Sequence, residues 1–265
     1  MRALLARGRR LFCGVVHLAA LPGAPRFAGS FEAVLERAVS DARALVDGGV
    51  DALLVENFGD APFFAGSVPP ETVAAMARAL GAVGEVSGHR PLGVNVLRND
   101  ARAALALCAA AGASFLRVNV HTGAMVTDQG LVEGRAAETL RERARLAPEA
   151  LILADLHVKH ATPLGSESIE EAALEAFERG GADALIVTGT RTGVPVDAKD
   201  LVRVKESLPR APLLVGSGLT EANAAALLAH ADGAIVGTWL ERDGVSGNEV
   251  DPERVARLRR AFDAV

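Results

Sequence analysis

The sequence predicts one (β/α)₈ barrel over residues 1–265, with its site at the carboxyl ends of the strands. Short apolar runs alternate with longer helical patterns eight times. Links from helix to strand are short, whereas many links from strand to helix are long. Polar residues recur where the apolar runs end. Together these features are typical of a parallel barrel that binds its ligand at one end.

The expected strands are short apolar runs, as in parallel strands buried on both faces. They are Leu11–His17, Ala52–Glu56, Leu92–Val96, Phe115–Val120, Leu151–Asp155, Ala184–Thr188, Leu213–Val215 and Ala234–Val236. The helical patterns between and after them cover Phe31–Asp47, Pro70–Val86, Ala101–Ala111, Arg135–Leu146, Ile169–Arg179, Ala198–Ser207, Glu221–Ala229 and Pro252–Phe262. Capping residues support three helix starts: Pro69-Pro70, Thr220 and Asp251-Pro252.

Four strand entries share a short link that fits a left-handed helix end followed by a turn into the strand. These links are Gly49-Val50-Asp51, Gly112-Ala113-Ser114, Gly181-Ala182-Asp183 and His230-Ala231-Asp232. The long strand-to-helix links are His17–Ser30, Glu56–Pro69, His121–Gly134, His157–Ser168 and Thr188–Asp197. A doubly wound open sheet is the competing fold, but no GxGxxG motif follows the first strand.

Strand alternation predicts which side chains point into the barrel. If the last polar residue of each strand points inward, six strands contribute a polar group at a similar height. These residues are His17, Glu56, Asn95, Asn119, Asp155 and Thr188. The outward set is then apolar: Val16, Val55, Val94, Val118, Ala154 and Val187. Such an alignment indicates a functional mouth.

Composition excludes several classes of protein. The net charge is −5 and no basic run exceeds two residues, which argues against nucleic-acid binding. Cys13 and Cys108 lie in apolar runs without a CxxC pair, so we expect small core residues in a reducing compartment. No apolar segment is long enough for a membrane span. The start resembles a signal peptide, but His17 and Pro22-Gly23 interrupt its apolar region. We therefore expect a cytoplasmic protein.

Asp155, His157 and Lys159 follow one another at alternate positions in ADLHVKH, directly after an apolar run. With His17 and Glu56 they are the candidate catalytic residues, because carboxylates and imidazoles held together can pass protons near neutral pH. His17, Glu56, Asp155 and His157 could instead hold a divalent metal ion as cofactor. Lys159 could act as a Schiff-base nucleophile, although its neighbours look polar and an amine needs desolvation for that role.

Arg117 is the one basic residue inside a strand, so we expect it inside the barrel, paired with Glu56 or Asp155. The residues expected to bind substrate are Asn95, Arg117, Asn119, His121 and Thr188. Two glycine-rich turns follow the last two strands, Gly216-Ser217-Gly218 and Gly237-Thr238. Backbone N–H groups there, at the start of the seventh helix, are expected to bind phosphate. Glycines used only for tight turns are the alternative.

Several longer motifs resemble the BtpA/SgcQ family. They are VVHLAALPGAP, VENFGDAPF, PLGVNVLRND, RVNVHTGAMVTDQGLVEG, ILADLHVKHATPLG, ALIVTGTRTG, LVGSGLTEAN and IVGTWLERDG. The resemblance runs from about Cys13 to Val255 and implies a TIM barrel akin to ribulose-phosphate-binding barrels. The family also carries a name from photosystem I biogenesis in cyanobacteria, which describes a phenotype rather than a reaction.

The leading hypothesis is an enzyme of lyase, isomerase or hydrolase type that acts on a phosphorylated small molecule, by acid–base or metal-assisted chemistry. A non-catalytic assembly factor that uses the barrel as a binding module is the second hypothesis. A nucleotide-binding hydrolase is a third, weakened by the absence of a P-loop. Homo-oligomerisation is left open.

Overall fold

In the computed structural model, which describes residues 1–5, 9–165 and 167–265, eight parallel strands close into a barrel. Around the barrel they follow the order β1-β11-β10-β9-β7-β4-β3-β2. Their bounds are β1 Leu11–His17, β2 Ala52–Glu56, β3 Leu92–Asn95, β4 Phe115–Val118, β7 Leu151–Leu156, β9 Ala184–Val187, β10 Leu213–Val215 and β11 Gly233–Val236. The predicted fold class is therefore confirmed.

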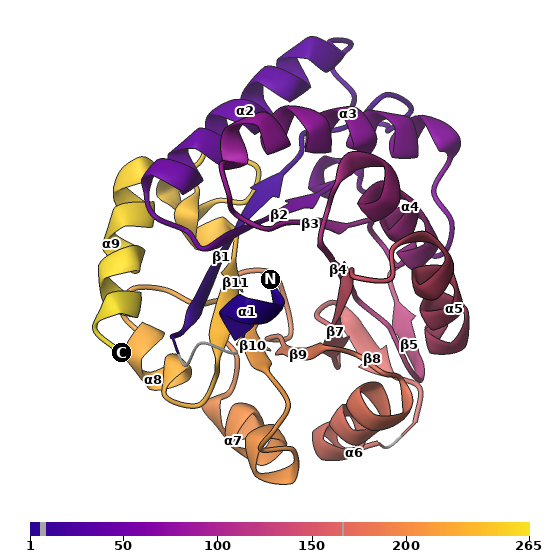
Figure 1. The fold of residues 1–265 in the computed structure, drawn as a ribbon, viewed down its shortest axis with the longest axis vertical. Helices are drawn as coiled ribbons and strands as arrows, with labels where there is room; N and C mark the ends of the chain where they lie inside the picture. Colours follow the sequence, from indigo (N-terminus) through magenta and orange to yellow (C-terminus); the bar gives the residue numbers. More distant parts are fainter. Residues whose placement is uncertain (6–8, 166) are drawn as a thin grey trace.

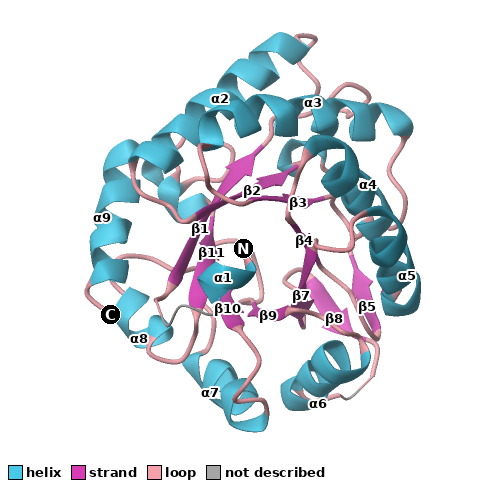
Figure 2. Ribbon diagram, in the orientation of Figure 1, coloured by secondary structure: helices cyan, strands magenta, loops and turns pink. Residues whose placement is uncertain are grey.

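Helices surround the barrel as an outer layer (Figures 1 and 2). They are α2 Phe31–Asp47, α3 Pro70–Ser87, α4 Ala101–Ala111, α5 Ala136–Leu146, α6 Ile169–Leu174, α7 Ala198–Ser207, α8 Ala224–Leu228 and α9 Pro252–Asp263. Polar caps define several starts. Ser30 accepts the Ala33 N–H at α2, and Ser168 and Glu171 form a reciprocal capping box at α6.

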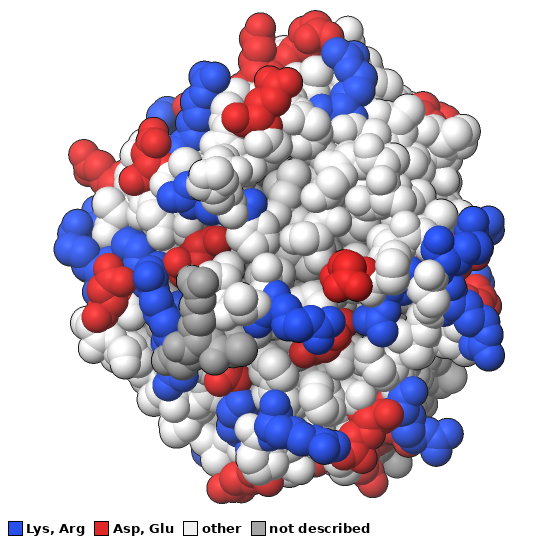
Figure 3. Space-filling model, in the orientation of Figure 1, with Lys and Arg blue, Asp and Glu red and all other residues white. Residues whose placement is uncertain are grey.

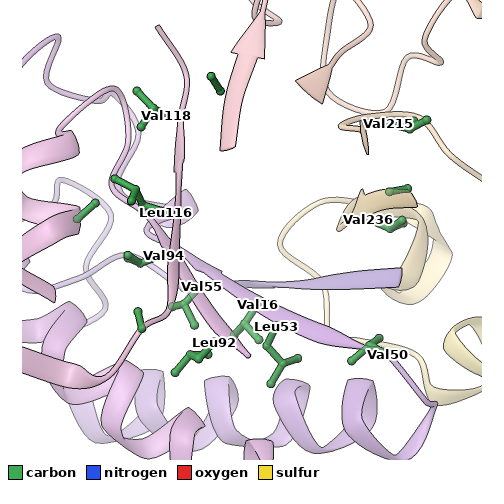
Figure 4. Close-up of a cluster of buried hydrophobic side chains, with 14 of the residues drawn as sticks. Val16, Val50, Leu53, Val55, Leu92, Val94, Leu116, Val118, Val215 and Val236 are labelled. Carbon is green, nitrogen blue, oxygen red and sulfur yellow. The ribbon is translucent and has the colours of Figure 1, made fainter. Parts of the chain in front are cut away.

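The alternation of side chains along the strands agrees with the prediction. The six outward residues expected from the sequence all belong to the apolar core between barrel and helices. Figure 4 shows part of this layer, with Val16, Val55, Val94 and Val118 among its members. Inside the barrel lies a second apolar cluster, with Phe115 as its largest side chain. A Cβ on Gly93 would lie 2.2 Å from the Phe115 ring, so glycine at this strand position makes room for the ring.

A short helix, α1 (Arg2–Leu5), covers the amino-terminal end of the barrel, in the centre of Figure 1. Met1, Leu4 and Leu5 pack against the inner cluster. From the sequence this start resembled a signal peptide, and no helix was expected here; residues 6–8 of the same stretch lie outside the described part of the chain.

The link expected over His121–Gly134 is not an open loop. It contains strands β5 (Ala124–Thr127) and β6 (Gly130–Glu133), which form a hairpin, and β8 (Ala161–Pro163) pairs with β5. The three-stranded antiparallel sheet stands beside the carboxyl end of the barrel. Asp128, in the turn of the hairpin, lines a pocket at the mouth.

Surface charge, helix length and the two cysteines bear on the expectations from composition. On the face drawn in Figure 3, basic and acidic side chains are interspersed and no broad area carries a single sign. Across the described residues, every helix is too short or too polar to span a bilayer. Cys13 and Cys108 are buried and free, and burial raises the pKa of both thiols, as expected for inert core cysteines.

Candidate functional site at the carboxyl end of the barrel

A buried ion-pair network forms the floor of the barrel mouth. Arg117 Nε donates to Asp155 Oδ1 at 2.9 Å and Arg117 Nη2 to Asp155 Oδ2 at 3.0 Å. Arg117 Nη1 donates to Glu56 Oε1 at 3.2 Å. The predicted pairing of Arg117 is therefore confirmed. Asn95 donates to Glu56 Oε1 at 3.1 Å and Asn119 to Asp155 Oδ2 at 2.8 Å, which completes the network.

The network shifts the pKa values of Arg117 and Glu56 in the directions that keep both charged. Burial alone would lower the pKa of Arg117, but the Asp155 and Glu56 carboxylates outweigh it and raise that pKa. Burial would raise the pKa of Glu56, but the Arg117 guanidinium, helped by His17 and Lys159, lowers it overall. Glu56 is thus an ionised carboxylate at neutral pH. Its Oε1 accepts two hydrogen bonds, whereas Oε2 faces His17 Nε2 at 3.8 Å.

His17 is held by a residue that the sequence analysis missed. Its Nδ1 lies 2.5 Å from Glu241 Oε1, and Phe58 stacks on the imidazole with ring centroids 4.3 Å apart. The other Glu241 oxygen accepts the Gly247 N–H at 2.8 Å, which fixes the carboxylate. Glu241 lies in the loop after β11, 224 residues from His17, so no strand pattern could have indicated it. The pair fixes one imidazole nitrogen and leaves Nε2 toward the mouth.

Two adjoining pockets occupy the mouth and share Glu56, Arg117, Lys159 and Thr192. The first also contains His17, both predicted glycine turns and Thr220. The second also contains Asn95, Asn119, Arg98 and Asp128. Eleven sequence-predicted site residues border these two pockets. They are His17, Glu56, Asn95, Arg117, Asn119, Lys159, Gly216, Ser217, Gly218, Gly237 and Thr238. Asp155 lines neither pocket and is connected to them through Arg117.

The two glycine turns offer unpaired backbone donors. Within the described residues, the N–H groups of Ser217, Gly218, Gly237 and Thr238 donate to no protein acceptor, whereas Gly216 N–H donates to Val187 O at 2.8 Å. Gly218 has a φ of +64°, and an added Cβ would lie 2.3 Å from Pro195 N, so its backbone requires glycine with or without a ligand. Free amide groups that face a pocket can bind an anion.

One part of the phosphate prediction was wrong. The seventh helix was expected to begin at Glu221, beside the Gly216–Gly218 turn. Instead α8 begins at Ala224 and has five residues, and a turn precedes it. Any anion donors here are therefore the amides of the loops themselves and not those of a helix start.

Three predicted site residues are not part of the lining of the two pockets. His157 has a φ of +46°, which ends the strand alternation after Leu156, and its buried Nε2 has no partner in the described part of the chain. His121 is buried, with Nε2 2.8 Å from Gly180 O, and burial lowers its pKa. Thr188 lies under Gly216, and its buried Oγ1 has no partner among the described residues. These three residues line neither pocket.

The proposed metal ligands do not converge. His17 and Glu56 approach each other, but both Asp155 oxygens accept hydrogen bonds from Arg117 or Asn119, and His157 lines neither pocket. Over residues 1–5, 9–165 and 167–265, no three or more His, Cys, Asp or Glu side chains are grouped so as to hold a metal ion. The four predicted ligands therefore do not form a single metal site in this arrangement.

Lys159 lines both pockets, so it lies where they adjoin. Its side chain makes no hydrogen bond or ion pair with the described residues, in contrast to every other charged group of the floor. Burial, followed by the nearby Arg117 charge, lowers the pKa of Lys159 from its usual value to about 8, against the opposite effect of Glu56 and Asp155.

Comparison with solved structures identifies the fold. A phosphoribosyl anthranilate isomerase of Thermus thermophilus superposes with a TM-score of 0.59 at 14% identity, covering 96% of this chain and 99% of that one. An orotidine 5'-phosphate decarboxylase of Pyrococcus horikoshii gives a TM-score of 0.57 at 16% identity, covering 95% and 97%. At these identities the similarity shows a shared TIM barrel.

Sequence relatives are much closer. An uncharacterized protein of Pyrococcus abyssi is 46% identical over 97% of this chain and 98% of its own. The photosystem I biogenesis protein BtpA of Synechocystis is 46% identical over 94% of this chain and 86% of its own. The sgc region protein SgcQ of Escherichia coli is 38% identical over 91% and 90%. The BtpA family model matches residues 9–264, and the chain belongs to the BtpA family.

Proposed function

We propose that this barrel is an enzyme that acts on a phosphorylated small molecule of the sugar-phosphate class by acid–base chemistry. The observation that carries the proposal is the composition of the first pocket. Both glycine turns border the same cavity as His17 and Glu56. A phosphate held at the turns would therefore place the rest of the molecule against the two groups that can move protons.

The phosphate end of the site is built from backbone donors. Ser217, Gly218, Gly237 and Thr238 present four N–H groups without protein partners in the described residues, and Thr220 adds a hydroxyl at the pocket wall. Amide donors on bare loops satisfy a phosphate dianion through charge-assisted hydrogen bonds. The Arg117 guanidinium is already paired with the Glu56 and Asp155 carboxylates. It therefore contributes to the electrostatic potential at the bottom of the pockets but is not available as a direct phosphate ligand.

The chemical end of the site is the His17–Glu56 pair. With Nδ1 engaged by Glu241, His17 can accept or donate a proton only through Nε2, which faces Glu56 Oε2. Glu56 is kept ionised, so its negative charge can stabilise the imidazolium that forms when Nε2 takes a proton. Asn95 and Asn119 border the second pocket and donate hydrogen bonds to the Glu56 and Asp155 carboxylates. These bonds orient the two amide groups, which could then hydrogen-bond to hydroxyl groups of a substrate.

Two proteins of the same fold are named for phosphorylated substrates, orotidine 5'-phosphate and a phosphoribosyl anthranilate. The likeness to them concerns the fold, and the proposal depends on the loops of this chain. Mass spectrometry of small molecules released from the purified protein tests it. We expect a phosphorylated compound of low mass, lost when Thr220 is replaced by Glu. Recovery of only unphosphorylated compounds in both proteins would contradict the proposal.

The second candidate function is a non-catalytic assembly factor, favoured by the name of the Synechocystis relative. The antiparallel sheet offers a surface for such a role. Val126 and Leu131, cross-strand neighbours in the β5–β6 hairpin, are 48% and 50% exposed. If binding through this sheet were the function, Val126→Ser with Leu131→Ser would abolish it and His17→Asn would leave it intact. The enzymatic proposal expects the reverse.

A further inference from the structure

We propose that Lys159 forms a protonated Schiff base with the carbonyl carbon of a phosphorylated aldehyde or ketone. This inference rests on the proposed function and narrows the substrate class to carbonyl compounds. Lys159 lies between the pocket that contains the glycine turns and the pocket that contains Asn95 and Asn119. A molecule with its phosphate at the turns and its chain in the second pocket would pass directly over the amine.

The Lys159 amine is unlike the other two lysines of the chain. Lys205 Nζ donates to Asp232 Oδ2 at 2.7 Å and to Ala211 O at 2.9 Å, and Lys199 is exposed on α7. Lys159 Nζ, by contrast, has no acceptor among the described residues although carboxylates and amides surround it. An amine left unpaired in a pocket of paired groups is available to react with a ligand.

The choice of residue type supports a covalent role. Of the 28 Lys and Arg residues, three are lysine, at positions 159, 199 and 205. For anion binding alone an arginine would serve better, because its guanidinium makes two parallel hydrogen bonds. Arginine cannot lose its proton and cannot become a nucleophile, whereas a desolvated lysine beside another cation can.

Burial, more than the neighbouring charges, makes the neutral amine of Lys159 more accessible than that of an ordinary lysine. Arg117 and Arg98 oppose its protonation, and Glu56 and Asp155 favour it, with burial the largest effect. With a pKa of about 8, roughly a tenth of the amine is neutral at pH 7, compared with well under a thousandth for an ordinary lysine.

The backbone on either side of Lys159 is fixed to neighbouring loops. Arg98 Nη2 donates to the Lys159 carbonyl oxygen at 2.5 Å. The next residue, His160, donates its backbone N–H to Thr190 O at 3.0 Å, and its Nε2 lies 3.0 Å from Thr192 Oγ1. These contacts tie the lysine to the links that follow β3 and β9, so its amine is presented to the pocket from a supported turn.

The reaction balances without a further reactant. The neutral Nζ attacks the carbonyl carbon and a C–N bond forms. The carbonyl oxygen then takes a proton from His17 Nε2. The nitrogen then loses one proton to a base, and the hydroxyl group, protonated again, leaves as water while the C=N bond forms. The product is a protonated imine, which withdraws electrons from the adjacent carbon.

Reductive trapping tests the inference. The wild-type protein is incubated with dihydroxyacetone phosphate, glycolaldehyde phosphate or ribose 5-phosphate, and sodium borohydride is added. We expect a mass increase equal to the probe less one oxygen atom, and peptide mapping should place it on Lys159 at least ten times more often than on Lys199 or Lys205. Unphosphorylated glycolaldehyde should label Lys159 at least tenfold less. Lys159→Arg, which retains the charge, should give no adduct at this position.

The outcomes separate this inference from the function on which it rests. If the three probes raise the Tm of both wild type and Lys159→Arg but no adduct forms on Lys159, the Schiff base is excluded and the phosphate site stands. If the probes neither raise the Tm nor label Lys159, both proposals fail. Equal labelling of all three lysines would also overturn the inference, because it would show that the probes react with any lysine amine and not selectively with Lys159.

Discussion

Arg117 and Asp155 form a two-point ion pair on adjacent strands, with side chains that are 2% and 0% exposed. Asp155 is therefore buried beneath the pockets. It forms an ion pair with Arg117, and Arg117 in turn forms an ion pair with Glu56. Its position in the barrel makes it a positioning residue for the floor, rather than a group in contact with a ligand.

Asp155→Asn should destabilise the fold, because it leaves the Arg117 charge buried with only Glu56. We expect a loss of about 3–5 kcal/mol in the free energy of unfolding, measured by urea denaturation. Glu170→Gln, which breaks an exposed pair with Arg203, is the matched control and should change little. A loss from Asp155→Asn no larger than that of the control would show that the network contributes nothing to stability.

Glu241→Gln should release His17 from a single tautomer. The carboxylate accepts from Nδ1–H, whereas an amide can present either a donor or an acceptor to that nitrogen. Imidazole ¹⁵N shifts should move for His17 and stay constant for exposed His89. Once a substrate is known, kcat should fall on the order of 10²-fold or more. Unchanged ¹⁵N shifts would mean that Glu241 does not set the tautomer.

Thr220→Glu should block anion binding by placing a carboxylate at the wall of the first pocket. Thr220→Gln, of almost the same size but uncharged, is its control. Titration of each protein with inorganic phosphate, followed through Tm, should show stabilisation of wild type and Thr220→Gln and not of Thr220→Glu. Equal responses of the two variants would argue that phosphate binds elsewhere.

Lys159→Met should stabilise the protein near neutral pH. Since the folded-state pKa is about 8 and that of an unfolded lysine is about 10.4, both states are protonated below pH 8 and folding bears the full cost of the buried charge. Between the two values the unfolded state binds more protons, so wild-type stability rises with pH. We expect Lys159→Met to gain about 1–3 kcal/mol at pH 7, decreasing toward pH 10. A gain independent of pH would refute a depressed pKa.

Strand positions and the inward polar set were predictable because a closed parallel barrel forces alternate side chains to opposite faces. Glu56, Asn95, Arg117 and Asp155 follow this rule, and their contacts with one another follow from the register of neighbouring strands.

Features outside the regular strands could not be predicted in the same way. Glu241 reaches His17 from a loop, and His157 leaves the strand pattern through a left-handed backbone. The β5–β6 hairpin consists of two four-residue strands within a stretch that has glycine at positions 123, 130 and 134. Such a stretch is typical of a loop, and pairing with β8 completes the sheet. That the Lys159 amine has no partner among the described residues depends on how its neighbours pair with one another, and a local sequence pattern does not contain this information.

The claim that the two glycine turns bind phosphate is tested most directly by locating a bound anion in a crystal. Crystals of the wild-type protein soaked in selenate, a phosphate analogue with an anomalous signal, should show one strong site between Ser217-Gly218 and Gly237-Thr238, displaced by inorganic phosphate. Selenate bound only at other positions, with both turns empty at saturating concentration, would contradict the phosphate site and with it the proposed class of substrate.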